Sequence, residues 1–244
     1  MSVAENIARV EQQIEAACRE AGRARADVRL MAVSKTQPAE RIVEAYAAGV
    51  RLFGENRVQE FAVKRDALMA ARIFSGDTAA RVHCIGPVQT NKANRAAQIF
   101  DGVDSVDSVR VAEHLHRAAA AAGVMLPVLL EIKLSEEASK HGLLPDGPEL
   151  AELLERAPDW TQLRVRGLMT VPPYFEDAEQ ARPYFWRLRL LRDTLAQRHQ
   201  KLQFDELSMG MSHDFSVAIA EGATCVRIGT AIFGARAAQS QSTL

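Results

Sequence analysis

The sequence predicts an α/β fold in which eight parallel strands close into a barrel, with one additional helix at the N-terminus. Short apolar stretches typical of strands buried on both faces alternate regularly with helical stretches. Such alternation favours a parallel sheet with right-handed crossovers, and eight units close more naturally into a barrel than into an open sheet. The length of 244 residues agrees with the roughly 250 that one barrel domain uses. The pattern alone also fits a doubly wound open sheet.

The additional helix comes first. Apolar residues from Val3 to Ala17 recur every three to four residues, which predicts an amphipathic helix over residues 2–21 that ends at Gly22. Strands are then predicted at Val28–Val33, Arg51–Phe53, Val82–Ile85, Gly102–Ser105, Pro127–Ile132, Val165–Leu168, Glu206–Ser208 and Cys225–Ile228. Helices are predicted between them at Pro38–Ala48, Val58–Ala71, Gln89–Ile99, Val109–Ala122, Glu149–Ala157, Glu176–Arg198 and His213–Glu221, with a short final turn near Phe233.

Composition limits the classes of partner. The chain has no internal repeat and no linker rich in Pro, Gly or Ser, so residues 1–244 are interpreted as one domain. Lys and Arg number 30 and Asp and Glu number 31. The resulting net charge of −1 gives no global attraction to nucleic acid or to a membrane surface. Any charged ligand must therefore be held locally.

The sequence also predicts the cellular location of the protein and whether it binds a metal. The N-terminal segment is charged throughout, and no stretch approaches the roughly 20 apolar residues of a membrane span, so we expect a cytoplasmic protein. Cys18, Cys84 and Cys225 lie far apart and are expected to be reduced, buried thiols. The histidines show no spacing typical of metal ligands, so no metal site is expected.

Functional residues of a barrel gather at the carboxyl ends of its strands. Lys35 directly follows the first apolar run, so its amine is expected to be partly desolvated at the mouth of the barrel. Desolvation lowers the pKa of a lysine and yields the neutral amine that forms a Schiff base with a carbonyl. A lysine at a strand end can also be an ordinary surface charge.

Two loops favour the first interpretation of this lysine. The segment SMGMS (208–212) follows the seventh strand, with Ser212 as the predicted N-cap of the next helix, and Gly229 and Thr230 follow the eighth strand. Loops at these two places commonly bind phosphate in barrels through free backbone N–H groups and the helix dipole. Two such loops in this order favour a phosphate site, although each could be an ordinary capped turn.

Arg227 helps to choose the ligand. A barrel lysine with a phosphate cradle suggests pyridoxal 5′-phosphate (PLP) or a phosphorylated sugar aldehyde. Arg227 is predicted on the last strand beside the cradle, where a buried guanidinium needs an acceptor. A pyridine nitrogen would serve, which favours PLP. The alternative is a structural ion pair with a core carboxylate such as Glu55 or Glu206.

Four segments together resemble a known family: MAVSKTQPAERIVEAYAAGVRLFGENRVQE, IGPVQTNKA, GLMTVPP and ELSMGMSHDFSVAIAEGATCVRIGTAIFGAR. They closely resemble the pyridoxal phosphate homeostasis protein family, and the resemblance runs from about residue 3 to residue 236. Members of this family look like the N-terminal barrel domain of alanine racemase standing alone. The last segment is the most specific of the four.

The resemblance implies roles for individual residues. It implies that PLP is held as a Schiff base on Lys35, that Met211, Ser212, Gly229 and Thr230 hold its phosphate, that Arg227 faces the pyridine nitrogen, and that Asn56, Ser208 and Met209 line the ring. The sequence departs from the family pattern at Pro87 and Thr90, where IGPVQTNK replaces the commoner IGHLQSNK, and at His213, where an acidic residue is frequent. These departures put in doubt any role on the solvent side of the site for the loop after the third strand, which carries Pro87 and Thr90.

The family implies a non-enzymatic protein that buffers or delivers PLP, with apo forms of PLP enzymes as recipients, and we expect it to be a monomer. The alternatives are a PLP-dependent amino-acid racemase and a Schiff-base aldolase acting on a sugar phosphate. A racemase of this type uses a base from an additional β domain, for which we expect no room after the eighth strand. Arginine at the pyridine nitrogen also weakens the electron sink. Lys133, Lys140 and His141, after the fifth strand, offer a second amine or form a solvated charged loop.

Overall fold

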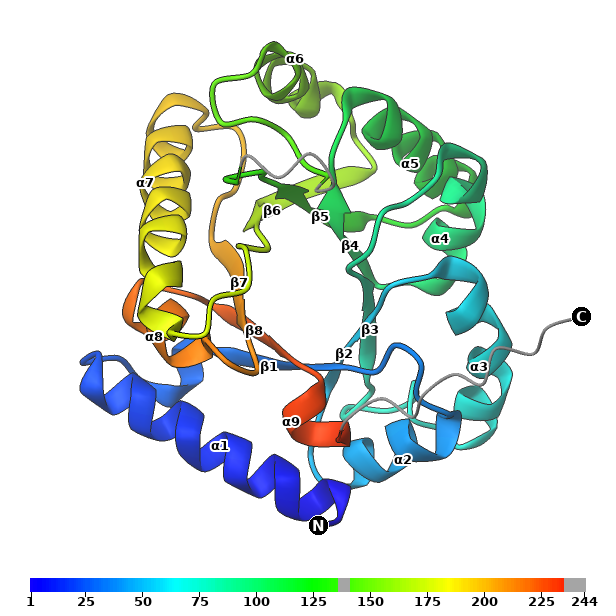
Figure 1. Cartoon of the computed structure of the whole chain (residues 1–244). Helices are drawn as coiled ribbons and strands as arrows, with labels where there is room; N and C mark the ends of the chain where they lie inside the picture. Colours follow the sequence, from blue (N-terminus) through cyan, green and yellow to red (C-terminus); the bar gives the residue numbers. More distant parts are fainter. Residues whose placement is uncertain (136–140, 235–244) are drawn as a thin grey trace, which may run out of the picture.

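The strands form a closed barrel in which each strand is parallel to both of its neighbours (Figure 1). This computed structural model describes residues 1–135 and 141–234. The strands are β1 (Arg29–Val33), β2 (Leu52–Glu55), β3 (Arg81–Cys84), β4 (Gly102–Val106), β5 (Leu126–Glu131), β6 (Leu163–Met169), β7 (Glu206–Met211) and β8 (Cys225–Ile228). β8 pairs with β1 to close the barrel, with Arg227 opposite Met31. The predicted barrel is confirmed, and the open-sheet alternative is wrong.

The helices surround the barrel on its outside (Figure 1). They are α1 (Val3–Glu20), α2 (Ala39–Ala47), α3 (Val58–Ala70), α4 (Ala93–Ile99), α5 (Val109–Ala122), α6 (Pro148–Arg156), α7 (Arg182–Arg198), α8 (Phe215–Ala220) and α9 (Thr230–Phe233). Short 3-10 turns occur at Arg25–Asp27, Thr90–Lys92, Ala157–Asp159 and Ala178–Ala181. Along the described part of the chain, none of these helices has the length and apolar character that crossing a membrane requires.

The additional N-terminal helix is part of the outer layer of helices. Ser2 and Glu5 form a reciprocal capping box at the start of α1, which satisfies backbone N–H groups that the helix leaves unpaired. The apolar stripe that the spacing predicts is buried, and α1 packs on α8 and α9. Asn6 is buried with it and donates from Nδ2 to the carbonyl of Ile232, 2.9 Å away. Helix α1 therefore supports the turn that follows β8.

The main hydrophobic core lies between the strands and the helices, and a smaller cluster of Met31, Leu52 and Cys225 is buried apart from it. All three cysteines are buried and free, as predicted. Burial raises the pKa of Cys84 and of Cys225 to about 12, so both thiols stay protonated at neutral pH.

β7 is longer than the sequence predicts, because it continues through Met211 instead of ending at Ser208. The extension depends on Gly210, whose φ of +92° lies in the left-handed region that favours glycine. A Cβ atom on Gly210 would lie 2.6 Å from the Cβ of Ala218 and 3.0 Å from the Cα of Phe215. Glycine therefore lets α8 approach the end of β7 closely.

Candidate functional site

A cavity of about 680 Å³ opens at the carboxyl ends of the strands. Seven of the residues that the sequence predicts for a site line it, namely Lys35, Asn56, Met211, Ser212, Arg227, Gly229 and Thr230. They come from the ends of β1, β2, β7 and β8, which are distant in the sequence and meet only because the barrel closes.

Lys35 is half-buried in the turn that follows β1. Its neighbour Ser34 is fully buried, and its other neighbour, Thr36, has a φ of +63°. A β-branched residue rarely adopts a left-handed backbone, so contacts from elsewhere must hold it there.

Those contacts come from α3 and β2. Lys64 on α3 donates from Nζ to the carbonyl of Ser34 at 3.1 Å and to Oε1 of Glu55 at 2.9 Å. The hydroxyl of Ser34 donates to the same Glu55 oxygen at 2.7 Å. Lys64 also pairs with Glu60 at 2.8 Å, and Glu60 accepts a hydrogen bond from the backbone N–H of Thr36. The residues on both sides of Lys35 are thus tethered to one buried ionic network, which the sequence did not predict.

The network shifts two carboxyl groups in opposite directions. Burial raises the pKa of Glu55 above its usual value, and Lys64 and Ser34 only partly counter this. Partial burial also acts to raise the pKa of Glu60, but hydrogen bonds from Lys64 and from the Thr36 N–H lower it overall. Lys64 is therefore the cation that pairs with the buried Glu55 and partly offsets the effect of burial on its pKa.

The two loops after β7 and β8 are joined to each other. Ser212 does not cap the helix that follows it, contrary to the prediction, because α8 begins only at Phe215. Its hydroxyl instead accepts a hydrogen bond from the backbone N–H of Ala231 in α9, at 3.4 Å. Asp214 accepts from the backbone N–H of Met211 at 2.6 Å. Ser212 therefore links the two loops that were predicted to share one phosphate.

Backbone donors remain at the junction of these loops. In residues 1–135 and 141–234, no acceptor is found for the N–H groups of Ser212, Gly229 and Thr230. The N–H of Met211 donates to the Asp214 carboxylate, so it is not available to a ligand in this arrangement. A Cβ atom added at Gly229 would lie 3.4 Å from Val33, which is ordinary contact. A methyl group thus fits at Gly229, whereas a larger side chain would extend toward Val33 or into the cavity.

Arg227 is almost fully buried at the base of the cavity. Its Nη1 donates to the hydroxyl of Ser208 and its Nη2 to the carbonyl of Thr170, both at 2.8 Å. The predicted alternative of an ion pair with Glu55 or Glu206 is wrong, because Glu55 pairs with Lys64 and Glu206 with arginines at the other end of the barrel.

The charge of Arg227 is thus held by neutral partners. Burial lowers the pKa of this guanidinium, while the carboxylates of Asp104, Glu131 and Asp214 act in the opposite sense. The guanidinium is nevertheless the most basic side chain, and arginine is not deprotonated in proteins. Glu131, which lines the same cavity, has a pKa raised by burial.

Two predicted site residues lie away from the cavity wall. Ser208 is fully buried beneath Arg227 and touches the site only through the hydrogen bond to that guanidinium. Met209 is fully buried in the main hydrophobic core. On a strand, successive side chains point to opposite faces, so these two neighbours cannot both line one cavity. Neither of them is among the residues that line it.

The cavity is also lined by residues for which the sequence predicted no definite function. Gly86 and Pro87 line the wall, and a Cβ on Gly86 would lie 2.4 Å from the carbonyl oxygen of Asn56, so this loop packs directly on a predicted site residue. Lys133 and His141 also line the cavity, while Lys140 lies outside the described residues. The described residues contain no group of three or more His, Cys, Asp or Glu able to hold a metal ion.

The sequence matches the family described as "Alanine racemase, N-terminal domain" over residues 6–237. It is 45% identical over 236 residues to the pyridoxal phosphate homeostasis protein of Pseudomonas aeruginosa, and the match covers 96% of each chain. It is 42% identical to the protein of that name from Aquifex aeolicus, covering 97% of this chain and 99% of the relative.

Solved structures share the barrel. PipY of Synechococcus elongatus with PLP bound aligns at a TM-score of 0.83 and 38% identity, over 96% of this chain and 100% of PipY. An alanine racemase from Streptomyces coelicolor aligns at a TM-score of 0.64 and 24% identity, over 93% of this chain and 58% of the racemase, which is a likeness of fold.

Proposed function

Because the chain belongs to the pyridoxal phosphate homeostasis protein family, with the barrel of the alanine racemase N-terminal domain, we propose that it binds PLP and buffers or delivers it. The observation that carries the proposal is the meeting of three features in one cavity. These are a half-buried lysine, a pair of linked loops with backbone donors, and a buried arginine. The related protein PipY has been solved with PLP bound, which supports the same ligand here.

The residues of the cavity fit this cofactor. When bound, PLP supplies an aldehyde that condenses with a primary amine, and Lys35 is our proposed partner. The backbone N–H groups of Ser212, Gly229 and Thr230 suit a phosphate, since they have no acceptor in the described part of the chain and charge-assisted hydrogen bonds are strong. Met211 lies next to these donors, but its own N–H donates to Asp214, so we assign it no hydrogen bond to the phosphate.

Arg227 is proposed to face the pyridine nitrogen. Its two Nη atoms are fixed by Ser208 and Thr170, which supports a defined orientation of the guanidinium. A guanidinium donates a hydrogen bond but does not readily give up a proton, so the pyridine nitrogen would stay unprotonated. Ser208 then acts as a positioning residue for Arg227, and Asn56 is the proposed contact to the ring. The burial of Met209 in the core does not support direct contact with the ring.

This arrangement suits holding and releasing the cofactor more than catalysis. An unprotonated pyridine is a weak electron sink, which disfavours carbanion chemistry on amino acids. We further propose that residues 1–244 act as one PLP-binding unit, that the protein is a monomer in the cytoplasm, and that apo forms of PLP enzymes receive the cofactor. The names of the relatives describe homeostasis rather than a catalysed reaction, in accord with this proposal.

We expect Ser212 and Gly229 variants to weaken PLP retention unequally. Ser212→Ala removes one link between the loops and leaves the backbone donors, so retention falls only a few-fold. Gly229→Val adds branched bulk where the phosphate approaches, so retention falls severely, while Gly229→Ala, for which there is room, stays near wild type. Equilibrium dialysis measures all three. Equal and negligible effects of Ser212→Ala and Gly229→Val would argue against this phosphate site.

The carrier function is tested by incubating PLP-loaded protein with L-alanine, D-alanine and a panel of other amino acids. Racemisation, transamination and decarboxylation are followed by chiral chromatography, and we expect none to exceed the rate with free PLP. Steady turnover near the ordinary enzyme range of about 1–10³ per second would instead support the racemase-like alternative.

A further inference from the structure

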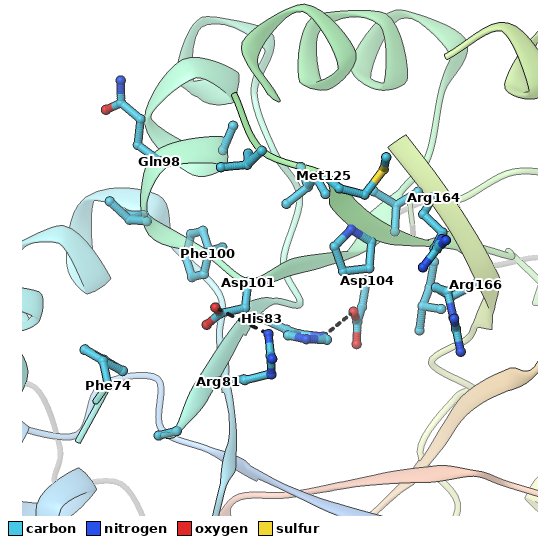
Figure 2. A pocket seen from close by; sticks show the side chains of 18 of the residues that line it. Phe74, Arg81, His83, Gln98, Phe100, Asp101, Asp104, Met125, Arg164 and Arg166 are labelled. Carbon is cyan, nitrogen blue, oxygen red and sulfur yellow. Dashed lines mark hydrogen bonds and ion pairs between the residues drawn. The ribbon is translucent and has the colours of Figure 1, made fainter. Parts of the chain in front are cut away.

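A second and larger cavity, of about 850 Å³, lies at the opposite end of the barrel, where the strands begin (Figure 2). It shares no lining residue with the cavity that holds Lys35. Arg29 lines the lower cavity and Val33 the upper one, and Met31, between them on the same face of β1, is fully buried in the small apolar cluster. The two cavities are therefore separate spaces.

The lining of the lower cavity is strongly cationic. It contains five arginines and three carboxylates: Arg29, Arg65, Arg81, Arg164 and Arg166, with Asp101, Asp104 and Glu206. This local excess of positive charge contrasts with the overall charge of −1. Charged groups that line a cavity with low-dielectric walls focus the field and attract ligands of the opposite sign.

The carboxylates are already engaged. Asp104 pairs with Nδ1 of His83 at 2.8 Å, and Figure 2 shows this contact at the centre of the cavity. Burial lowers the pKa of His83, but the Asp104 carboxylate more than offsets this, so the pKa of His83 is raised overall. Asp101 accepts from the backbone N–H of Val82 at 2.8 Å, and Arg81 lies 4.0 Å from its other oxygen.

The two arginines of β6 differ in how far their side chains are engaged. Arg166 donates from Nη1 to Oε1 of Gln203 at 3.0 Å, and its Nη2 lies 3.4 Å from a carboxylate oxygen of Asp205. Glu206 is shared between Arg29 and Arg166, with 3.7 Å from Nε of Arg166 to the nearer carboxylate oxygen. That Nε atom is buried and makes no hydrogen bond with any described residue. The Arg164 side chain is exposed and makes neither an ion pair nor a hydrogen bond with any described residue. Figure 2 shows Arg164 and Arg166 together on one side of the cavity.

The other side of the cavity carries aromatic side chains beside the Arg81–Asp101 pair (Figure 2). Phe74 and Phe100 lie across from the two β6 arginines, and Met125 lies at the edge (Figure 2). Met125 is 52% exposed, so its side chain is accessible at that edge. A cavity with convergent cations on one wall and aromatic side chains on the other suits an anionic molecule with an apolar part.

We propose that the lower cavity is a binding site for a small organic anion, whose phosphate or carboxylate group is held by Arg164 and Arg166 and whose apolar part lies against Phe74 and Phe100. This site does not depend on PLP or on Lys35, since the two cavities have separate linings. The cavity volume is within the range of about 300–1,000 Å³ that accommodates metabolite-sized ligands.

Isothermal titration calorimetry with phenyl phosphate, benzoate and neutral phenol tests the proposal. The titrations use the Gly229→Val background, so that the upper phosphate site does not contribute. We expect phenyl phosphate to bind at one site, and Arg164→Ala and Arg166→Met each to weaken it by at least about ten-fold. Binding of benzoate as well would identify a general oxyanion site, whereas binding of phenyl phosphate alone would identify a site for phosphomonoesters.

Arg198→Ala is the matched control, because Arg198 is exposed on α7 and lines neither cavity. It should leave the affinity unchanged. Arg164→Ala removes an exposed side chain and should not alter the thermal midpoint, so it remains informative even if Arg166→Met folds poorly. The proposal is overturned if neither anion binds, if phenol binds as tightly as phenyl phosphate, or if Arg164→Ala binds phenyl phosphate like the wild type.

Discussion

Lys35→Ala is expected to abolish the yellow absorption of the PLP-loaded protein and the adduct that borohydride fixes. The reason is that Lys35 combines a place at the cavity wall with partial burial and with neighbours that are tethered on both sides. The phosphate contacts to backbone N–H groups would persist, so the variant should still bind PLP, but weakly and reversibly. Spectroscopic titration with PLP, before and after reduction, measures both effects.

Lys133→Ala is the matched control for that experiment, since Lys133 lines the same cavity from the loop after β5. It should retain the absorption and the adduct. If Lys133→Ala lost the adduct while Lys35→Ala kept it, the covalent site would belong to the other wall of the cavity.

Lys64→Met is expected to have the largest effect on stability. It leaves the Glu55 carboxylate, which is fully buried, without its cation, and breaking a buried pair in this way costs about 3–5 kcal/mol. It also removes the hydrogen bond from Lys64 to the carbonyl of Ser34 and the ion pair between Lys64 and Glu60. The turn that carries Lys35 therefore loses its connection to α3 through Lys64. Urea unfolding measures the first effect, and the rate of adduct formation with PLP measures the second.

The pH dependence separates this mechanism from a simple loss of packing. The pKa of Glu55 is raised above its ordinary value of 4.5 in the folded protein, so its contribution to stability is full below that value and is lost as the pH rises. Removing Lys64 raises that pKa further. The destabilisation should therefore be small near pH 4 and full at neutral pH, and Lys64→Met with Glu55→Gln should recover most of it.

Lys201→Met is the matched control, because Lys201 is exposed in the loop before β7 and lines neither cavity. Its effect should stay within about 0.5 kcal/mol. A Lys64→Met variant that unfolded with the same free energy as the wild type at pH 7 would show that the buried pair contributes nothing to the fold.

The fold could be predicted from the sequence because the signal is repeated. Eight buried strands alternate with helices, and each strand pairs with the next, so an error of one or two residues at a boundary does not alter the topology. The length of β7 was missed because Gly210 has the appearance of a loop residue, whereas here it lets α8 approach the strand.

The site could be predicted only in part. Lys35 and the loops after β7 and β8 lie just beyond strand ends, and Arg227 lies near the carboxyl end of β8, so the barrel rule locates them. The hydrogen bond of Ser212 was missed because its partner, Ala231, is in α9, beyond the next strand. The Lys64 network was missed because the residues that it joins are on different elements, and no spacing along the chain indicates such a contact.

Peptide mapping of the borohydride-reduced protein tests the central claim most directly. The protein is loaded with PLP, reduced, digested and analysed by mass spectrometry, with every lysine-containing peptide scored. We predict one PLP adduct, on the peptide that contains Lys35. An adduct on Lys92, Lys133 or Lys140 in its place, or no adduct on any peptide, would contradict the claim that Lys35 holds the cofactor.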